Sequence, residues 1–278
     1  MSVLTVSNLT KRYPSFTLDD VSFSVEEGRI CGLIGANGAG KSTTLKSITG
    51  LIAAEGEVKI CGLDAREEGA KALYGYAGGG FRFYGQKRVK SLAAVCASFY
   101  PAWNVERFLR LLGGYGIAPE KRISQLSEGM KVKLSLAIAL SHGAKLLILD
   151  EPTSGLDPVS REEFCDEIAR LAKEEGTAVL FSTHICSDLS RAADDVVFLS
   201  EGKVLANCPI GELLSRYDVA RFAVSDGAEA IGLKACKEGF EGLVPRGSAP
   251  EGAIVRQATL DEIILHLEYG RRTECVRS

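Results

Sequence analysis

The stretch GLIGANGAGKSTTLKSITG, residues 32–50, decides how this chain of 278 residues folds. It places Gly35, Gly38 and Gly40, followed by a lysine and hydroxyl residues, between an apolar run and a stretch with helical spacing. Glycine loses more backbone freedom on folding than other residues do, so it is costly in ordered structure. Three glycines this close together therefore indicate a turn in which the bare backbone itself is needed.

The spacing fits the pattern G-x-x-x-x-G-K-[ST], with Lys41 and Ser42 at its end. In such a loop the backbone N–H groups converge on phosphate oxygens, where a Cβ would obstruct them, and the following helix adds its positive N-terminal end. Lys41 is expected to reach the β- and γ-phosphates, and the Ser42 hydroxyl to ligate Mg²⁺. The expected nucleotide-binding residues are Gly35, Ala36, Asn37, Gly38, Ala39, Gly40, Lys41, Ser42 and Thr43.

Unbroken apolar runs are typical of strands buried on both faces, and they occur at 30–35, 146–150 and 178–183. Between the last two runs, apolar residues recur with the period of a helix at Phe164, Ile168 and Leu171. Asp157-Pro158 is expected to open that helix as its N-cap and first residue. Buried strands that alternate with helices predict an α/β fold with a parallel sheet.

The other segments predict additions to this core. Residues 3–10 and 18–28 alternate apolar and polar side chains, which predicts half-exposed strands in an N-terminal antiparallel part. Residues 80–142 carry no buried-strand run and are expected to form a helical insertion. Residues 196–206 predict an antiparallel hairpin, and the tail predicts short strands and a final amphipathic helix.

We therefore expect a phosphate-loop NTPase fold with a mostly parallel core sheet. The expected domain covers residues 1–212, with the helical subdomain at about 80–142 inside it. A small accessory region, 213–278, is expected to follow as a C-terminal extension.

Two carboxylates end the second buried run, LLILDEP at 146–152. Asp150 is expected to hold the magnesium shell, as a Walker B aspartate does, and Glu151 to polarise a water for attack on the γ-phosphate. His184 ends the next apolar run; a histidine there is more often structural, but here it can hold Glu151 and the water in line. The sequence contains no N/T-K-x-D motif, which disfavours a guanine-binding protein.

Taken together, the motifs resemble the ATPase subunit of an ATP-binding cassette (ABC) transporter over roughly residues 2–212. The matching features are, in order, Tyr13, the phosphate loop at 35–43, LSEGM at 126–130, LLILDEP at 146–152, SGLD at 154–157 and His184. The resemblance implies ATP and Mg²⁺ as cofactors, stacking of adenine on Tyr13, and ATP hydrolysis coupled to transport. The sequence around these motifs is most similar to that of the ATPase subunits of bacterial exporters of drugs, antibiotics and lantibiotics.

The segment LSEGM is similar to the signature motif of this family. Ser127 and Gly129 are expected at a helix start, where a hydroxyl and backbone N–H groups form an anion site. By itself the segment would be an ordinary N-capped helix start. The resemblance implies that this site binds the γ-phosphate held by a second ATPase subunit, identical or different, in a head-to-tail dimer, with Asp157 near the interface.

Two positions depart from the family pattern. The glutamine that usually follows the third core strand falls on Gly79, and Gln86 lies too far along the chain to inherit its role. That glutamine normally touches Mg²⁺ and the attacking water, so we expect slow hydrolysis without the membrane partner. Glu128 replaces the usual glycine at the third signature position, which varies in the family.

Composition excludes several other classes. The formal net charge is -3, which gives no reason to expect nucleic acid as a partner. The eight cysteines form no C-x-x-C pair, so free thiols in a reducing compartment are expected. The N-terminus has no signal-peptide core, and no window approaches about 18 consecutive apolar residues. The family resemblance implies a chain that is cytoplasmic and peripheral on the inner face of the cell membrane, bound to a transmembrane permease subunit.

Three functions remain open on the sequence. The first is an ATPase subunit that powers export through a separate transmembrane subunit. The second is a soluble ABC-type ATPase that acts on a ribosome or a nucleic-acid complex, which a single cassette without a basic stripe disfavours. The third is a regulator without turnover, against which the presence of Lys41, Asp150, Glu151 and His184 argues.

Overall fold

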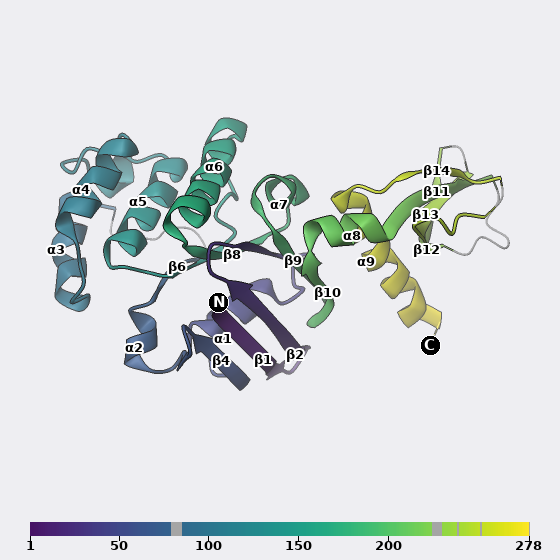
Figure 1. The fold of residues 1–278 in the computed structure, drawn as a ribbon, viewed down its shortest axis with the longest axis horizontal. Helices are drawn as coiled ribbons and strands as arrows, with labels where there is room; N and C mark the ends of the chain where they lie inside the picture. Colours follow the sequence, from purple (N-terminus) through teal and green to yellow (C-terminus); the bar gives the residue numbers. More distant parts are fainter. Residues whose placement is uncertain (79–84, 224–229, 238, 251, 278) are drawn as a thin grey trace. The chain divides into compact units, whose positions relative to one another are not determined.

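The computed structural model describes residues 1–78, 85–223, 230–237, 239–250 and 252–277 (Figure 1). The chain divides into two compact units, Met1–Leu205 and Ala206–Ser278. The division falls inside strand β10 (Lys203–Pro209), whereas the sequence placed the end of the first domain after residue 212.

The first unit is built on a six-stranded sheet with the order β10-β9-β3-β8-β7-β6. The adjacent pairs β9-β3, β3-β8, β8-β7 and β7-β6 are all parallel, so the expected parallel core is confirmed. Every residue of β3, β7 and β8 is buried, as the unbroken apolar runs predicted. The strands besides β10 are β3 (Ile30–Ile34), β6 (Tyr74–Gly78), β7 (Leu146–Asp150), β8 (Ala178–Thr183) and β9 (Asp195–Ser200).

Layers of other elements cover both faces of this sheet (Figure 1). On one face lie α1 (Lys41–Ile48) and an antiparallel sheet of order β2-β1-β4-β5, which share a large apolar core with it. On the other face lie α6 (Pro158–Glu175) and α7 (Cys186–Ala192). The strands of the antiparallel sheet are β1 (Ser2–Tyr13), β2 (Phe16–Glu26), β4 (Glu55–Ile60) and β5 (Leu63–Asp64), and α2 (Glu68–Lys71) follows them.

The helical insertion predicted for the middle of the chain is present between β6 and β7. It has an apolar core of its own, which includes Phe108, Leu112 and Leu134. A Cβ placed on Gly75 of β6 would lie 2.2 Å from the Cβ of Ala139, so α5 packs closely against this edge strand. Its helices are α3 (Val89–Phe99), α4 (Val105–Gly114), the 3-10 turn η1 (Ile123–Gln125) and α5 (Glu128–Ser141).

The second unit contains a small antiparallel sheet and two helices, α8 (Ile210–Arg216) and α9 (Leu260–Arg277). The sheet has the order β12-β13-β11-β14, and α9 packs mainly on β12, where Nδ1 of His266 lies 2.8 Å from the carbonyl oxygen of Gly232. The short strands and final helix expected for the tail are therefore present. The strands are β11 (Tyr217–Phe222), β12 (Ile231–Cys236), β13 (Gly239–Pro245) and β14 (Ile254–Gln257).

Candidate functional site

The phosphate loop connects β3 to α1, and its backbone explains its glycines. Gly38 and Gly40 have φ angles of 86° and 113°, in the region where a Cβ is strained. A Cβ on Gly35 would lie only 2.2 Å from the carbonyl oxygen of Leu199. All three glycines are thus required by the turn or by close packing against β9, as the opening stretch of sequence indicated.

Lys41, the first residue of α1, is 5% exposed, and its ammonium group reaches back across the loop. Its Nζ donates to the carbonyl oxygens of Gly35 at 2.7 Å and Ala36 at 3.3 Å. The same Nζ lies 3.6 Å from Oε1 of Glu151. A buried ammonium group held at the start of a helix is a strong anion-binding centre.

Oxygen donors gather beside this lysine. Ser42 Oγ donates to Oδ1 of Asp150 at 3.1 Å, and Ser182 Oγ donates to the same oxygen at 2.7 Å. Asp150 is 6% exposed, so its carboxylate orientation is fixed by these hydroxyls rather than by water. One carboxylate and one hydroxyl suit Mg²⁺, which takes few protein ligands and completes its shell with water and phosphate oxygens.

Glu151 occupies a strained backbone position at the end of β7. Its φ is 50°, and its N–H donates to Ser182 Oγ at 2.9 Å. A non-glycine residue in this region costs about 1 kcal/mol or more, and such residues cluster at functional sites. The turn places the carboxylate between Lys41 and His184, whose Nδ1 lies 2.9 Å from Oε2 of Glu151.

Lys41, Ser42 and Glu151 line a cavity of about 190 Å³, the nucleotide cavity, and Asp150 and His184 lie behind it, bonded to Ser42 and to Glu151. Apart from Phe16, its lining comes from residues that the sequence assigned to the site: Asn37, Gly38, Gly40, Lys41, Ser42, Thr43 and Glu151. Ala36 and Ala39 belong to the loop without lining the cavity, and the N–H of Ala39 donates to the Ala36 carbonyl at 3.1 Å.

Phe16 is the aromatic residue that lines the cavity, and the expected stacking of adenine on Tyr13 stays a prediction. Tyr13 ends β1, carries Lys11 over its ring at 5.4 Å, and is absent from the cavity lining. Phe16, at the start of β2, lines the cavity, and its ring centroid is 6.5 Å from that of Tyr13. The sequence could have suggested Phe16 as well, because it follows Tyr13 after one tight turn. Only the folded hairpin of β1 and β2 shows which of the two rings faces the phosphate loop.

Ser127 lies outside this cavity. It is exposed at the N-terminus of α5, where its Oγ accepts a hydrogen bond from the N–H of Met130 at 3.2 Å. A Cβ on Gly129 would lie 3.2 Å from Ser160 Oγ, so this helix start contacts the start of α6. The predicted N-capped helix is present, and neither Ser127 nor Gly129 lines the cavity at the phosphate loop of the same chain.

Asp157 caps α6 as predicted. Its Oδ1 accepts from the N–H groups of Val159 and Ser160, both at 3.0 Å, and its Oδ2 accepts from the Ser160 hydroxyl. These hydrogen bonds, led by the one from the Ser160 side chain, lower the pKa of the Asp157 carboxyl. The carboxylate therefore stays charged at neutral pH.

The position of the family glutamine, Gly79, lies outside the described residues. Gln86 is described and exposed, and its side-chain oxygen accepts a hydrogen bond from Arg122 at 3.3 Å. This contact lies within the helical subdomain, so Gln86 is already engaged away from the nucleotide cavity.

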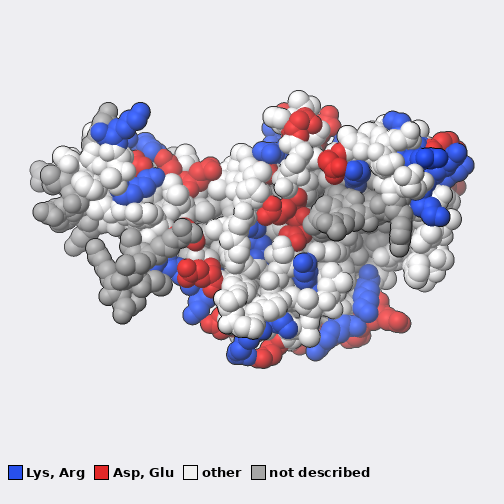
Figure 2. Space-filling view, turned by 180° about the vertical axis from the view of Figure 1, so that it is seen from behind, with Lys and Arg blue, Asp and Glu red and all other residues white. Residues whose placement is uncertain are grey.

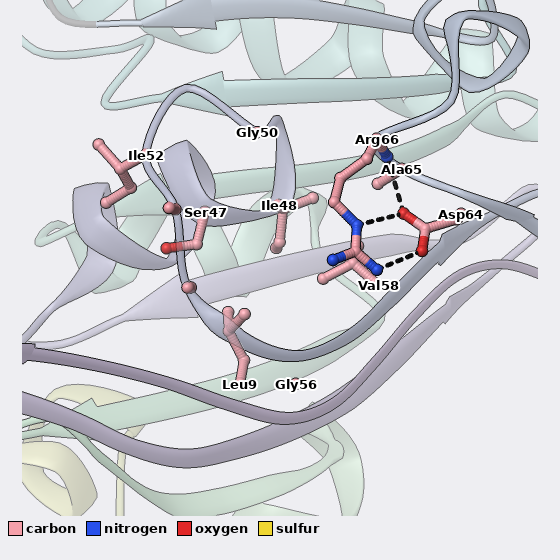
Figure 3. Close-up of a pocket in the computed structure, with 12 residues that line it drawn as sticks. Leu9, Ser47, Ile48, Gly50, Ile52, Gly56, Val58, Asp64, Ala65 and Arg66 are labelled. Carbon is pink, nitrogen blue, oxygen red and sulfur yellow. Dashed lines mark hydrogen bonds and ion pairs between the residues drawn. The ribbon is translucent and has the colours of Figure 1, made fainter.

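A second hollow, of about 230 Å³, lies at the other end of α1 and shares no lining residue with the nucleotide cavity (Figure 3). Its walls are mostly apolar, from β1, α1 and β4. The Arg66 guanidinium pairs with Asp64 at its rim and holds the pKa of that carboxyl well below its usual range. With no unpaired charge among these described residues, we assign it no part in phosphate binding.

Comparisons with known proteins agree with this geometry. Residues 18–154 match the family described as ABC transporter. The chain is 34% identical over 237 residues to the bacitracin transport ATP-binding protein BcrA of Enterococcus faecalis, covering 81% of this chain and 75% of that protein. This chain belongs to the ABC transporter family. It is also 36% identical over 220 residues to the lantibiotic transport ATP-binding protein SrtF of Streptococcus pyogenes, covering 73% and 89% of the two chains.

Among solved structures, an ATP-binding subunit of an ABC transporter aligns with a TM-score of 0.68 and 28% identity, covering 76% of this chain and 91% of that one. The family resemblance and the phosphate-loop NTPase fold expected from the sequence are confirmed. This ABC cassette binds and hydrolyses ATP as the ATPase subunit of a transporter. None of the helices in the described parts of the chain has both the length and the apolar character needed to cross a bilayer.

Proposed function

We propose that this cassette powers export through a separate transmembrane permease, and that ATP joins two ATPase subunits head to tail. The observation that carries the dimer is the position of Ser127. Most of the other residues expected to contact phosphate, from Asn37 to Thr43, line one cavity, whereas this hydroxyl and its helix N-terminus lie exposed outside it. A second subunit would bring its own signature helix to the nucleotide and complete the site.

The relatives support the proposed role in transport out of the cell. The bacitracin and lantibiotic transport proteins are named for their cargo, and both are about one-third identical to this chain. With the same support we propose that the chain works at the inner face of the cell membrane. We further propose that residues 1–212 form the catalytic domain and 213–278 an accessory region.

The residues present have separate roles in hydrolysis. Lys41 and the loop N–H groups bind the phosphates, and Ser42 and Asp150 would hold Mg²⁺. When bound, the metal neutralises the charge that builds on the phosphate oxygens. Glu151 accepts the proton of the attacking water, and His184, 2.9 Å from its carboxylate, orients it.

A function on ribosomes or nucleic acid has less support. On the face shown in Figure 2, basic side chains are scattered among acidic ones rather than gathered in a stripe. With a formal net charge of -3, the chain lacks the electrostatic attraction on which phosphate-backbone binding depends.

A mixing experiment tests the proposed dimer. Lys41→Ala removes the phosphate-loop ammonium, and Ser127→Asp retains an N-cap but repels the γ-phosphate. Each variant alone has two defective sites per dimer. In a head-to-tail dimer of one variant with the other, one site contains both native residues, so mixing should restore ATPase activity.

In an equal mixture about half of the dimers contain both variants, and each of these has one native site of two. Activity that approaches about one quarter of the rate of the native chain would support the shared site. If each variant alone is inactive and the mixture stays inactive over a range of ratios and concentrations, the sites are not shared. For export, co-reconstitution with the candidate permease in vesicles should raise the ATPase rate; equal rates with and without the permease would contradict coupling.

A further inference from the structure

One face of α6 forms a row of polar contacts with the helical subdomain, which we call the polar seam. Across it Glu163 pairs with Lys133 and Glu167 accepts from Tyr115, while Arg170 supports Glu167 from the same helix and Ser160 lies against Gly129. The four α6 positions are three or four residues apart, which places them on one side of the helix. The seam therefore runs along α6 from the turn that follows Glu151.

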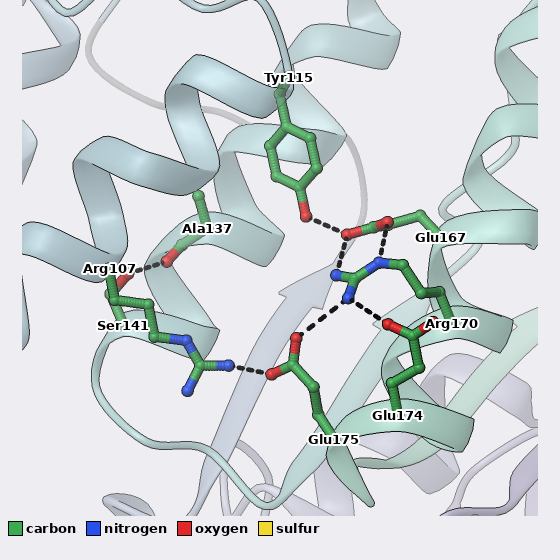
Figure 4. Close-up of polar contacts among 8 residues, drawn as sticks. All are labelled: Arg107, Tyr115, Ala137, Ser141, Glu167, Arg170, Glu174 and Glu175. Carbon is green, nitrogen blue, oxygen red and sulfur yellow. Dashed lines mark hydrogen bonds and ion pairs between the residues drawn. The ribbon is translucent and has the colours of Figure 1, made fainter.

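The best-connected part of the seam is the contact between Tyr115 and Glu167 (Figure 4). The Tyr115 hydroxyl donates to Oε1 of Glu167 at 2.5 Å, and Arg170 donates to both oxygens of this carboxylate at 3.0 Å. Glu167 is only 15% exposed, so these partners, more than water, satisfy its charge. Burial and this hydrogen bond raise the pKa of Tyr115, so its hydroxyl remains a donor at neutral pH.

Two neighbouring contacts extend the row. Nearer the signature helix start, Lys133 of α5 pairs with Glu163 at 2.6 Å. At the other end, Arg107 of α4 pairs with Glu175 (Figure 4). The seam thus joins two helices of the subdomain to the single helix that follows the Walker B strand.

Polar contacts make up much of the contact between the helical subdomain and α6. The helical subdomain has its own apolar core, and a cavity of about 360 Å³ separates parts of α4 and α5 from α6. Tyr115, Lys133, Glu163, Glu167 and Arg170 all line that cavity. Apolar packing also holds α5, at Gly75 and Ala139 and through the buried Leu136 and Leu140, so the seam acts together with this packing to set the rotation of α5.

We propose that Glu167 is a positioning residue for the ATPase reaction: by binding Tyr115 it holds the helical subdomain at the rotation at which Ser127 meets the nucleotide of a second subunit. The inference rests on the proposed dimer. It predicts that loosening the seam weakens ATP-dependent dimerisation and leaves the phosphate loop intact, because that loop runs from β3 into the start of α1 and none of the seam residues belongs to it.

The test uses the full chain with Glu151→Gln, which is expected to bind ATP without rapid turnover. Sedimentation equilibrium with saturating Mg-ATP gives the dimer dissociation constant, with and without Tyr115→Phe. Calorimetry with ADP, which lacks the γ-phosphate, reports on the phosphate loop alone. Two helical subdomains enter each dimer, so if each is correctly oriented one-third of the time, the apparent constant rises about ninefold.

We expect Tyr115→Phe to raise the dimer constant about three- to tenfold with ADP affinity unchanged. Glu167→Gln keeps an acceptor for Tyr115 but weakens the pairing with Arg170, and should raise it too. Tyr74→Phe is the matched control, because it removes a hydroxyl that donates to the Thr49 carbonyl at 3.1 Å, outside the seam. It should change neither constant.

An unchanged dimer constant in both seam variants overturns the inference. An equal loss of ADP affinity overturns it too, because the variants would then act on the general structure. If the Glu151→Gln parent itself stays monomeric with ATP, the proposed dimer fails. That result is distinct from a seam failure, in which parent and variants dimerise equally well.

Discussion

Replacing Glu151 with Gln should nearly abolish ATP turnover while preserving ATP binding. The Gln side chain has the same shape and keeps a carbonyl oxygen near His184 Nδ1, now 2.9 Å from the carboxylate. It cannot accept the proton of the attacking water. It also removes a negative charge from beside the phosphates, so ATP affinity should be equal or higher.

The expected magnitude separates catalysis from stability. Proton transfer to a positioned side chain contributes about 10²–10⁴-fold to a rate, so turnover should fall by about that factor. The lost attraction between Glu151 and the Lys41 ammonium, 3.6 Å away, is worth about 1 kcal/mol in bulk water and about 4 kcal/mol at the effective dielectric of a partly buried pair. The carbonyls of Gly35 and Ala36 still hold the ammonium, so the variant should fold and the defect should lie in the chemical step.

Phosphate release measures the turnover of the variant, and calorimetry with ATP measures its affinity. Glu106→Gln is the control, since Glu106 is an exposed glutamate on α4, away from the nucleotide cavity. It should turn over ATP at the native rate. Turnover of Glu151→Gln within about threefold of native would refute the assignment of Glu151 as the base.

Lys41→Ala should weaken ATP binding about 10- to 150-fold in calorimetry, because a charge-assisted hydrogen bond is worth about 1.5–3 kcal/mol; unaltered affinity would exclude its phosphate contact. Phe16→Ala should weaken ATP binding at least about fivefold through lost base stacking, and more than Tyr13→Ala does; the reverse order would return the adenine contact to Tyr13. The hydrogen bond from Arg256 lowers the pKa of Glu262 from 4.5 to about 2. The pair therefore stabilises the second unit fully at pH values above about 4.5, and this contribution is lost as the pH falls toward 2. Glu262→Gln should therefore flatten the acid side of a thermal-denaturation series between about pH 5 and 2, and an unchanged acid slope would contradict the pairing.

The phosphate loop and the buried strands were predictable because their signals are local. The glycines at 35, 38 and 40 respond to the geometry of their own turn, and the apolar runs of β3, β7 and β8 respond to burial on both faces. The N-cap at Asp157 is likewise set within three residues. Such patterns retain their meaning whatever the rest of the chain does.

Contacts between distant segments were less predictable. The sequence nominated Tyr13 for the cavity, but the turn between β1 and β2 puts Phe16 there. The left-handed backbone of Glu151 and the polar seam gave no recognisable signal either, because each depends on partners tens of residues away.

The sequence by itself thus determined the fold class, the phosphate chemistry and the identity of the carboxylates, because short-range sterics and burial are encoded where they act. The tertiary structure decided which aromatic ring lines the cavity, how Ser182 orients Asp150 and Glu151, and that Ser127 stands apart from its own phosphate loop. Those relations are set by the packing of whole elements, and no single stretch of residues contains them.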